Sequence, residues 1–339
     1  MSAHSLPQNY LHVTFDEPGA PDVLHLIRSQ LPKIEEDQVL IRVHVAGVNG
    51  PDLAQRKGVY PAPTGASSIL GLEVAGEVVA LGSKVTRWQL GERVCALVPG
   101  GGYGEYVATY ADHCLPIPHG WRDSDAAAIV ETFFTVWGNL FMRAGLKVGE
   151  TVLIHGGSGG VGSAAVVLAK AFGAKVITTS GSNEKCEHCV TLGAELALNY
   201  RSDFVTPVME HTQGRGVDVV FDMAGGDFIN QNLKALAMDG RMVSVAMQRG
   251  ATAEVDIFRI MAKRIRWTGS TLRPQSVGAK AEITTQLLER VWPLLDCELE
   301  SSTQLKPHVF AEFPLYECAK AHTLMEAGEH RGKLVLRVE

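Results

Sequence analysis

The stretch that decides the fold is Thr151-Val152-Leu153-Ile154-His155-Gly156-Gly157-Ser158-Gly159-Gly160-Val161-Gly162. A short apolar run leads into clustered glycines, and a segment of small and apolar residues follows at 163–172. This order predicts a buried strand, a tight turn and a helix. Gly157, Gly159 and Gly162 have the G-x-G-x-x-G spacing. In that pattern the first glycine permits the turn, the second lets a pyrophosphate approach the backbone, and the third lets helix and strand pack closely.

The predicted loop also has the chemistry that a diphosphate requires. Backbone N–H groups of such a turn, together with the positive end of the helix dipole, attract phosphate. We therefore predict that a dinucleotide contacts this loop at Gly157, Gly159, Gly160, Val161 and Gly162. The alternative is a glycine-rich turn in an α/β unit that binds no ligand.

The composition describes a globular chain and argues against one class of partner. The 339 residues suggest two domains of about 150 residues each. With 46% hydrophobic and 20% charged residues, the chain can bury a sizeable core. A net charge of −6 argues against nucleic acid as the main partner.

No segment predicts secretion or membrane insertion. Residues 1–10 lack the apolar core of a signal peptide, and no apolar run approaches the roughly 20 residues that span a bilayer. The six cysteines are scattered, apart from Cys186 and Cys189, and do not resemble a disulfide framework. The expected location is the cytoplasm, with no membrane partner.

The residues before the glycine loop predict a mostly β domain. Residues 1–127 read as strands and turns with frequent glycine and proline. Alternation and β-branched residues predict strands at 39–45, 71–82, 93–98 and 105–108.

The pattern changes near residue 123 to alternating helices and strands. We expect helices at 125–144, 163–172, 183–192 and 229–237, and strands at 151–154, 175–180, 218–222, 241–246 and 266–271. Such alternation predicts a doubly wound parallel sheet with helices on both faces, which is the α/β Rossmann class.

The last residues of the chain have the strand pattern of the first domain. A helix is expected at 275–295, and the strands at 308–310 and 334–338 resemble the first domain more than the second. We therefore predict that residues 128–271 form an inserted dinucleotide-binding domain. The other domain then consists of residues 1–127 and 272–339.

The second strand of the inserted domain indicates which cofactor is used. In NAD-preferring sites an acidic residue ends this strand and holds the ribose hydroxyls. Here the corresponding segment contains Ser180, Gly181 and Ser182 and no carboxylate, and Lys185 follows shortly after. Hydroxyls and a cation suit a 2′-phosphate, which favours NADPH. Alternatively Lys185 is a solvated helix residue, and the nearby Glu184 weakens the argument.

Taken together, these motifs resemble the medium-chain dehydrogenase/reductase superfamily. The resemblance is to its zinc-free quinone oxidoreductase (zeta-crystallin-like) branch, and within that branch to the p53-inducible type. It extends over nearly the whole chain and is carried by residues 46–53, 56–61, 71–78, 102–107, 131–137 and 149–170. The branch usually has Gln at the position of Val167, and Ala or Ser is common at the position of Gly157.

The resemblance has consequences for fold and assembly. It implies a mostly β GroES-like domain into which the Rossmann domain is inserted. It also implies a homodimer through the last strand of the cofactor domain, for which residues 266–270 are the candidate edge. An exposed edge strand needs covering in any case.

The residues at the superfamily's catalytic zinc position argue against a metal. Catalytic zinc needs three protein ligands and an open position. Asn49 stands in place of the first Cys, Leu72 in place of the His, and Glu131 near the third position. Leucine cannot ligate a metal. Only Cys95 and Cys114 lie where the four-cysteine structural lobe would be, so we expect no metal.

Cys186 and Cys189 form the single C-x-x-C pair, with His188 between them. This spacing occurs in metal and redox sites. No second ligand pair accompanies it. The alternative to a metal or redox site is a helix with two incidental thiols.

Without zinc the acceptor must already be electron-poor, as quinones and α,β-unsaturated carbonyls are. The resemblance places Asn49, Asp52 and Tyr60 at the cleft and Thr135 at the nicotinamide. Tyr60 is expected to donate a hydrogen bond or a proton, because a phenol is a donor at neutral pH. Asn49 would orient the acceptor carbonyl, and Asp52 would hold the local loop. Tyr103 is a further candidate for the pocket wall.

Each of these assignments has a plainer alternative. Tyr60 could only shape the pocket, Asn49 could be a turn residue bonded to the backbone, and Thr135 could be an interior helix residue. The resemblance also places Tyr200 near the adenosine phosphate. Arg273 could approach the cofactor or could form a surface salt bridge.

Three functions fit these residues. The first is an NADPH-dependent quinone oxidoreductase acting on a small-molecule quinone. The second is a reductase of enones or enoyl thioesters, which needs the same hydride geometry. A nucleotide-binding structural protein without turnover is the third.

Overall fold

The computed structural model describes residues 6–295 and 305–338. Residues 1–5 of the segment in which no signal peptide is predicted lie outside these ranges. The chain divides into two compact units. The first unit comprises Met1–Glu131 and Arg273–Glu339, and the inserted unit comprises Thr132–Leu272. No helix of the described residues is both long and apolar enough to cross a membrane.

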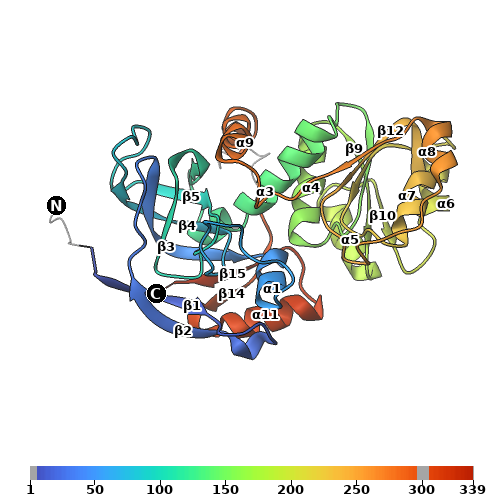
Figure 1. Ribbon diagram of the computed structural model, residues 1–339. Coiled ribbons are helices and arrows are strands. Elements are labelled where there is room, and N and C mark those ends of the chain that lie inside the picture. The colour runs from blue at the N-terminus through green and yellow to red at the C-terminus, as the bar shows by residue number, and fades with distance from the viewer. Residues whose placement is uncertain (1–5, 296–304, 339) are drawn as a thin grey trace. The chain divides into compact units, whose positions relative to one another are not determined.

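The inserted unit, whose strands β9, β10 and β12 are labelled in Figure 1, is built on a six-stranded sheet in the order β10-β9-β8-β11-β12-β13. All neighbouring strands are parallel. The order runs outward in both directions from β8 and β11, so the switch point where dinucleotides bind lies between them. The predicted Rossmann class is thereby confirmed. The strands are β8 (Thr151–Ile154), β9 (Lys175–Ser180), β10 (Leu196–Asn199), β11 (Val217–Asp222), β12 (Leu236–Ser244) and β13 (Arg266–Gly269).

Helices connect these strands. They are α3 (Val130–Val136), which begins at the end of the first unit, α4 (Gly160–Ala171), α5 (Asn183–Thr191), α6 (Val205–His211), α7 (Phe228–Ala235) and α8 (Ile257–Lys263). The sequence did not predict α6, α8 or β10, because these elements are only seven, seven and four residues long. The helix predicted to extend to residue 237 ends at Ala235, because Leu236 already pairs with Val217 of β11.

The helix predicted at 125–144 is interrupted, which corrects the sequence reading. It consists of α2 (Asp123–Ala127), α3, and a π-helix at Trp137–Arg143. The side chain of Asn139 donates to the carbonyl oxygen of Thr135 at 2.9 Å, and the N–H of Ala144 reaches back five residues to Asn139. A side chain bonded into the ladder widens the last turns in this way.

The first unit contains a seven-stranded sheet in the order β14-β15-β3-β4-β5-β7, with β6 also paired to β3. The strands are β3 (Gln38–Val48), β4 (Glu73–Leu81), β5 (Arg93–Leu97), β6 (Tyr106–Tyr110), β7 (Cys114–Pro116), β14 (Val309–Pro314) and β15 (Lys333–Arg337). A separate ribbon joins β1 (Asn9–Thr14) to β2 (His25–Gln30). The C-terminal strand β15 is antiparallel to β3, so the two ends of this unit share one sheet.

Among the described residues, three α-helices accompany this sheet besides α2: α1 (Gly50–Arg56), α9 (Val277–Arg290) and α11 (Cys318–Ala327). Only α9 was predicted. The Gly50-Pro51 pair reads as a turn, yet proline is tolerated in the first helical turn. Asn49 and Asp52 form a capping box that starts α1.

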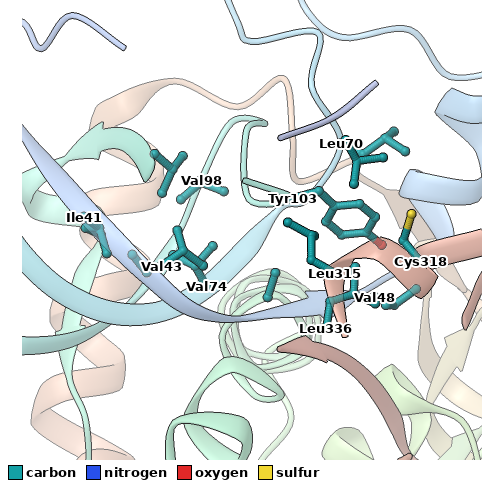
Figure 2. Packing of buried hydrophobic residues seen from close by; sticks show 14 of the residues in the cluster. Ile41, Val43, Val48, Leu70, Val74, Val98, Tyr103, Leu315, Cys318 and Leu336 are labelled. Carbon is teal, nitrogen blue, oxygen red and sulfur yellow. The ribbon is translucent and has the colours of Figure 1, made fainter. Parts of the chain in front are cut away.

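The core of the first unit lines the sheet and extends to Cys318 on α11 (Figure 2). The ring of Tyr103 lies among Leu70, Leu315 and Cys318, and all four residues are buried. Val74 and Leu336 extend this apolar cluster along the sheet. The packing fixes β3 and β4, and the ends of these strands carry the polar residues described next.

Candidate functional site

The glycine loop joins β8 to α4 and leaves no room for a side chain at Gly157 or Gly162. A Cβ at Gly157 would lie 2.0 Å from Oγ1 of Thr178, and one at Gly162 would lie 2.0 Å from the carbonyl oxygen of Gly156. The turn itself needs Gly156, whose φ is 67°, which corrects the role predicted for Gly157. Gly157 is instead required for close approach to β9.

The start of α4 faces this loop. Gly159 is its N-cap, and Gly160, Val161 and Gly162 form its first turn, which contains no acidic residue. The N–H groups of a first turn have no intrahelical partner, and the helix dipole makes this end positive. The residues therefore fit a pyrophosphate.

The predicted adenosine residues gather at the ends of β9 and β10. Ser180 ends β9, and the Ser182 hydroxyl caps α5 by accepting from the N–H of Lys185 at 3.3 Å. A Cβ at Gly181 would lie 2.7 Å from the Tyr200 hydroxyl. Ser180 is buried, and its hydroxyl lies 3.4 Å from the sulfur of Cys189, so this side chain has a partner inside the protein.

Both cysteines of the C-x-x-C pair point into the protein. Cys186 and Cys189 are buried on α5. Burial raises the pKa of the Cys189 thiol to about 11 and also raises that of Cys186. Buried protonated thiols are unreactive, which favours a helix with two incidental thiols over a metal or redox site. Across residues 6–295 and 305–338, no group of three or more His, Cys, Asp and Glu side chains could hold a metal ion.

A chain of buried polar side chains, which the sequence did not predict, begins at His155 beside the glycine loop. His155 contacts Thr179 Oγ1 at 2.9 Å and Asn232 Oδ1 at 2.7 Å. Asn232 in turn donates to Asp222 at 3.4 Å, and Asp222 accepts from the N–H groups of Ala224 and Gly225. Burial lowers the pKa of His155, so the ring is neutral at physiological pH. In the sequence, only the position of His155 directly before the glycines points to this buried chain.

In the first unit, a buried network forms around Glu73. Its Oε1 accepts from Lys333 Nζ at 2.6 Å and from Asn49 Nδ2 at 2.8 Å, and its Oε2 accepts from the N–H of Glu131 at 2.8 Å. Lys333 also donates to Asn49 Oδ1 at 2.5 Å. Asn49 is thus held by side chains from β4 and β15 and keeps one amide hydrogen for a ligand.

This network does not suit zinc. Asn49, which stands in place of the first zinc ligand, and its partner Glu73 both accept hydrogen bonds from the Lys333 ammonium. Leu72 is buried and contributes no ligand. A cation at this point would face an ammonium group instead of a set of three ligands.

Asp52 holds the loops around this network, as predicted. Its Oδ2 accepts from the N–H of Asn49 and its Oδ1 from the N–H of Gly71, both at 2.9 Å. Its side chain is buried. Burial raises its pKa from 3.8 to about 6, against the opposing effect of the two N–H donors.

The raised pKa of Asp52 predicts a pH dependence of stability. The folded state holds a proton that the unfolded state releases, so this contribution is present below pH 4 and is lost as pH rises through about 6. The difference between a pKa of 3.8 and one of about 6 corresponds to roughly 3 kcal/mol. The free energy of unfolding of wild type relative to Asp52→Asn should therefore fall between pH 4 and 6. A flat difference in urea titrations over this range would contradict the assignment.

Tyr60 follows α1 and is anchored by its N–H to the carbonyl oxygen of Ala54 at 3.3 Å. Its side chain is half-buried, and this burial raises the pKa of the phenol, while the nearby Arg273 lowers it. The phenol therefore stays protonated and able to donate at neutral pH.

Arg273 belongs to the first unit and is buried. Its Nε donates to the carbonyl oxygen of Pro99 at 3.0 Å and its Nη1 to Gln55 Oε1 at 2.6 Å. Lys280 donates to the Arg273 carbonyl oxygen at 2.7 Å. The surface salt bridge considered as an alternative is absent among the described residues, since these guanidinium contacts are to neutral oxygens.

Two further candidates have surroundings that the sequence did not reveal. Tyr103 is fully buried, with its hydroxyl 3.1 Å from His322 Nε2 and 3.5 Å from Asp52, so it lies behind Asp52 and not at a pocket wall. Thr135 lies on α3 in the inserted unit, is 9% exposed, and gives its carbonyl to Asn139.

Two family models match this chain. One, described as zinc-binding dehydrogenase, covers residues 160–290, and the other, described as alcohol dehydrogenase GroES-like domain, covers residues 35–119. The first match covers most of the inserted unit and extends into the first unit, and the second covers the part of the first unit that contains Asn49 and Glu73.

Curated relatives include two kinds of protein. A component of the phenolphthiocerol/phthiocerol polyketide synthase of Mycobacterium tuberculosis is 34% identical over 330 residues, which are 97% of this chain and 15% of that synthase component. The chain thus spans only a small part of that relative. The quinone oxidoreductase of Mus musculus is 31% identical over 324 residues, which are 94% of this chain and 95% of that protein.

Similar solved structures include an enoyl reductase and a quinone oxidoreductase. The CurK enoyl reductase is 28% identical with a TM-score of 0.85, covering 98% of this chain and 100% of that one. The Escherichia coli quinone oxidoreductase complexed with NADPH is 27% identical with a TM-score of 0.80, covering 96% of this chain and 99% of that one.

Proposed function

Since the chain belongs to the medium-chain dehydrogenase/reductase superfamily and has quinone oxidoreductase homologues, we propose that it is a zinc-independent, NADPH-dependent quinone oxidoreductase. The observation that carries this proposal is the Lys333 ammonium between Asn49 and Glu73. It disfavours a Lewis-acid metal there, so the acceptor must be electron-poor without such help.

The proposed reaction needs one group of residues for the cofactor and another for the acceptor. NADPH supplies a hydride when bound at the glycine loop of residues 156–162. In the first unit, Tyr60 donates a hydrogen bond to the acceptor oxygen that gains negative charge, and then its proton, so that a quinone becomes a hydroquinone. Asn49 orients the acceptor carbonyl with its remaining amide hydrogen, and Asp52 keeps Asn49 in place. Solvent restores the Tyr60 proton.

One assay tests this proposal. The purified protein is mixed with NADPH and a panel of ortho- and para-quinones, enones and enoyl thioesters, and loss of the reduced nicotinamide absorbance is followed. Quinone reduction that withstands dialysis against a chelator supports the proposal. Absence of turnover with every acceptor, despite NADPH binding, would leave only the nucleotide-binding structural role.

The enoyl-thioester alternative also has a specific observation in its favour. The CurK enoyl reductase has the same fold over nearly the whole chain. The two reactions share their hydride geometry, so the panel decides between them by kcat/KM. A clear preference for enoyl thioesters over all quinones would replace the proposed acceptor class.

The cofactor preference is proposed from the β9 end, where Ser180, Gly181 and Ser182 offer no carboxylate. Lys185 stands in the first turn of α5 and is half-buried. Replacing Lys185 with Ala should raise the Kd of NADPH about tenfold, because a charge-assisted contact to phosphate is lost, while the Kd of NADH stays the same. Glu184→Ala is the matched control beside it. Equal changes for both cofactors would show that Lys185 does not contact the 2′-phosphate.

We also propose a homodimer through β13. This strand pairs only with β12 among the described residues and so leaves one edge open. The neighbouring α8 has no buried residue, and its Ile257, Phe258 and Met261 are at least 67% exposed. An open edge beside an apolar face is suited to a second copy.

Phe258→Asp should convert the proposed dimer to a monomer. A charge on the apolar face would have to be desolvated on association. Sedimentation velocity at micromolar concentration gives the answer, with Tyr316→Asp in the first unit as the control. A wild-type monomer would refute the dimer outright.

The expected location is compatible with the cysteines. The five cysteines described by the structure are all free and buried. Free thiols are usual in reducing compartments, which supports a cytoplasmic protein.

A further inference from the structure

A planar cation lies beside the residues assigned to the adenosine part of the cofactor. Arg249 follows β12, and its guanidinium carbon lies 4.7 Å from the centroid of the Phe228 ring. Its Nε and Nη2 donate to the two carboxylate oxygens of Asp227 at 2.7 and 2.8 Å. Phe228 therefore covers one face, and Asp227 occupies one edge of the group. The side chain is still 42% exposed.

This cation belongs to the same cluster as Tyr200. The rings of Phe228 and Tyr200 lie 5.9 Å apart, and Tyr200 interacts electrostatically with Arg249. The Tyr200 hydroxyl in turn lies over Gly181, which follows the end of β9. Arg249 thus lies close to the position where an adenosine ribose is expected, although it comes from the loop after β12.

The contacts of Arg249 decide what it can recognise. Asp227 already balances its charge and fixes its plane, so it is a poor partner for a further phosphate. The face away from Phe228 is the part left for a ligand. A guanidinium face stacks well on aromatic rings, which an ammonium group does not do.

We propose that Arg249 stacks on the adenine ring of the cofactor and that Phe228 and Asp227 hold it in place for this purpose. The inference rests on the proposed use of a nicotinamide dinucleotide. It is independent of which acceptor is reduced and of the 2′-phosphate preference.

Three reduced nicotinamides separate the parts of the cofactor. NADPH carries adenine and the 2′-phosphate, NADH carries adenine alone, and reduced nicotinamide mononucleotide carries neither. Their Kd values can be measured by the change in nicotinamide fluorescence without any acceptor. The test variant is Arg249→Lys, which keeps the charge and loses the plane.

Arg249→Lys should raise the Kd of NADPH and NADH by the same factor, about five- to thirtyfold. The Kd of the mononucleotide should not change. Lys185→Ala is the matched variant with the opposite pattern, since it should affect NADPH alone. Asp227→Asn, which frees the guanidinium plane, should give a smaller loss than Arg249→Lys for both dinucleotides.

Three results would overturn the inference. They are an unchanged Kd for both dinucleotides, a loss confined to NADPH, and an equal loss for the mononucleotide. A thermal melt of each variant by circular dichroism shows that the fold is intact. If none of the three nicotinamides binds wild type, the proposed function fails instead, so the two failures are distinguishable.

Discussion

Replacing Lys333 with Met should lower the free energy of unfolding by about 3 to 5 kcal/mol. Lys333 is 4% exposed and its partner Glu73 is fully buried. Methionine fills a similar volume but leaves the Glu73 carboxylate without its ammonium partner in a site closed to water. An unpaired buried charge costs far more than the pair contributes. Urea unfolding monitored by circular dichroism measures the change.

The double variant Lys333→Met with Glu73→Gln isolates the cause. It removes the charge as well as its partner, so it should recover a large part of the lost stability. Lys84→Met is the matched control, because Lys84 and its partner Glu36 are both mostly exposed. That change should cost less than about 1 kcal/mol. A similar small cost for Lys333→Met would contradict a buried ion pair.

Tyr60→Phe should lower kcat about a hundredfold while leaving the Kd of NADPH unchanged. The change removes only the hydroxyl, and with it the donor for the negative charge that develops on the acceptor oxygen. The ring stays, so a residue that only shapes the pocket would lose little. Single-turnover kinetics with a para-quinone separate the hydride step from product release.

The control for this prediction is Tyr316→Phe, since Tyr316 is 64% exposed in the same unit. It should leave both kcat and the melting temperature unchanged. If Tyr60→Phe keeps more than about a third of the wild-type kcat, the hydroxyl is not the donor.

The sequence predicted the inserted sheet well because its pattern is local. The glycine loop and the apolar strands at β8, β9 and β11 each have their own signal within a few residues. The helices α1, α6 and α8 were not predicted. Each is only seven residues long, which is too short for a helical hydrophobic pattern to be recognised. The π-helix depends on one side-chain contact from Asn139, which no periodicity reveals.

The sequence predicted which residues lie at the site, but it did not predict which side chains they contact. Asn49, Asp52 and Tyr60 lie in one short segment, and the resemblance pointed to them directly. Lys333 gave no such signal, because a charged residue at the start of an apolar strand usually faces water. Its burial follows from pairing with β3, which is distant in sequence. Arg249 was equally hidden in a polar loop.

The Glu73–Lys333 pair also has a consequence for the order of folding. Its two members are 260 residues apart in the chain, and the whole inserted unit lies between them. Closing so long a loop is slow, whereas the inserted unit is contiguous and needs no such closure. We expect the cofactor-binding unit to acquire protection from hydrogen exchange first during refolding. The Asn49 network would become protected only when β15 joins β3.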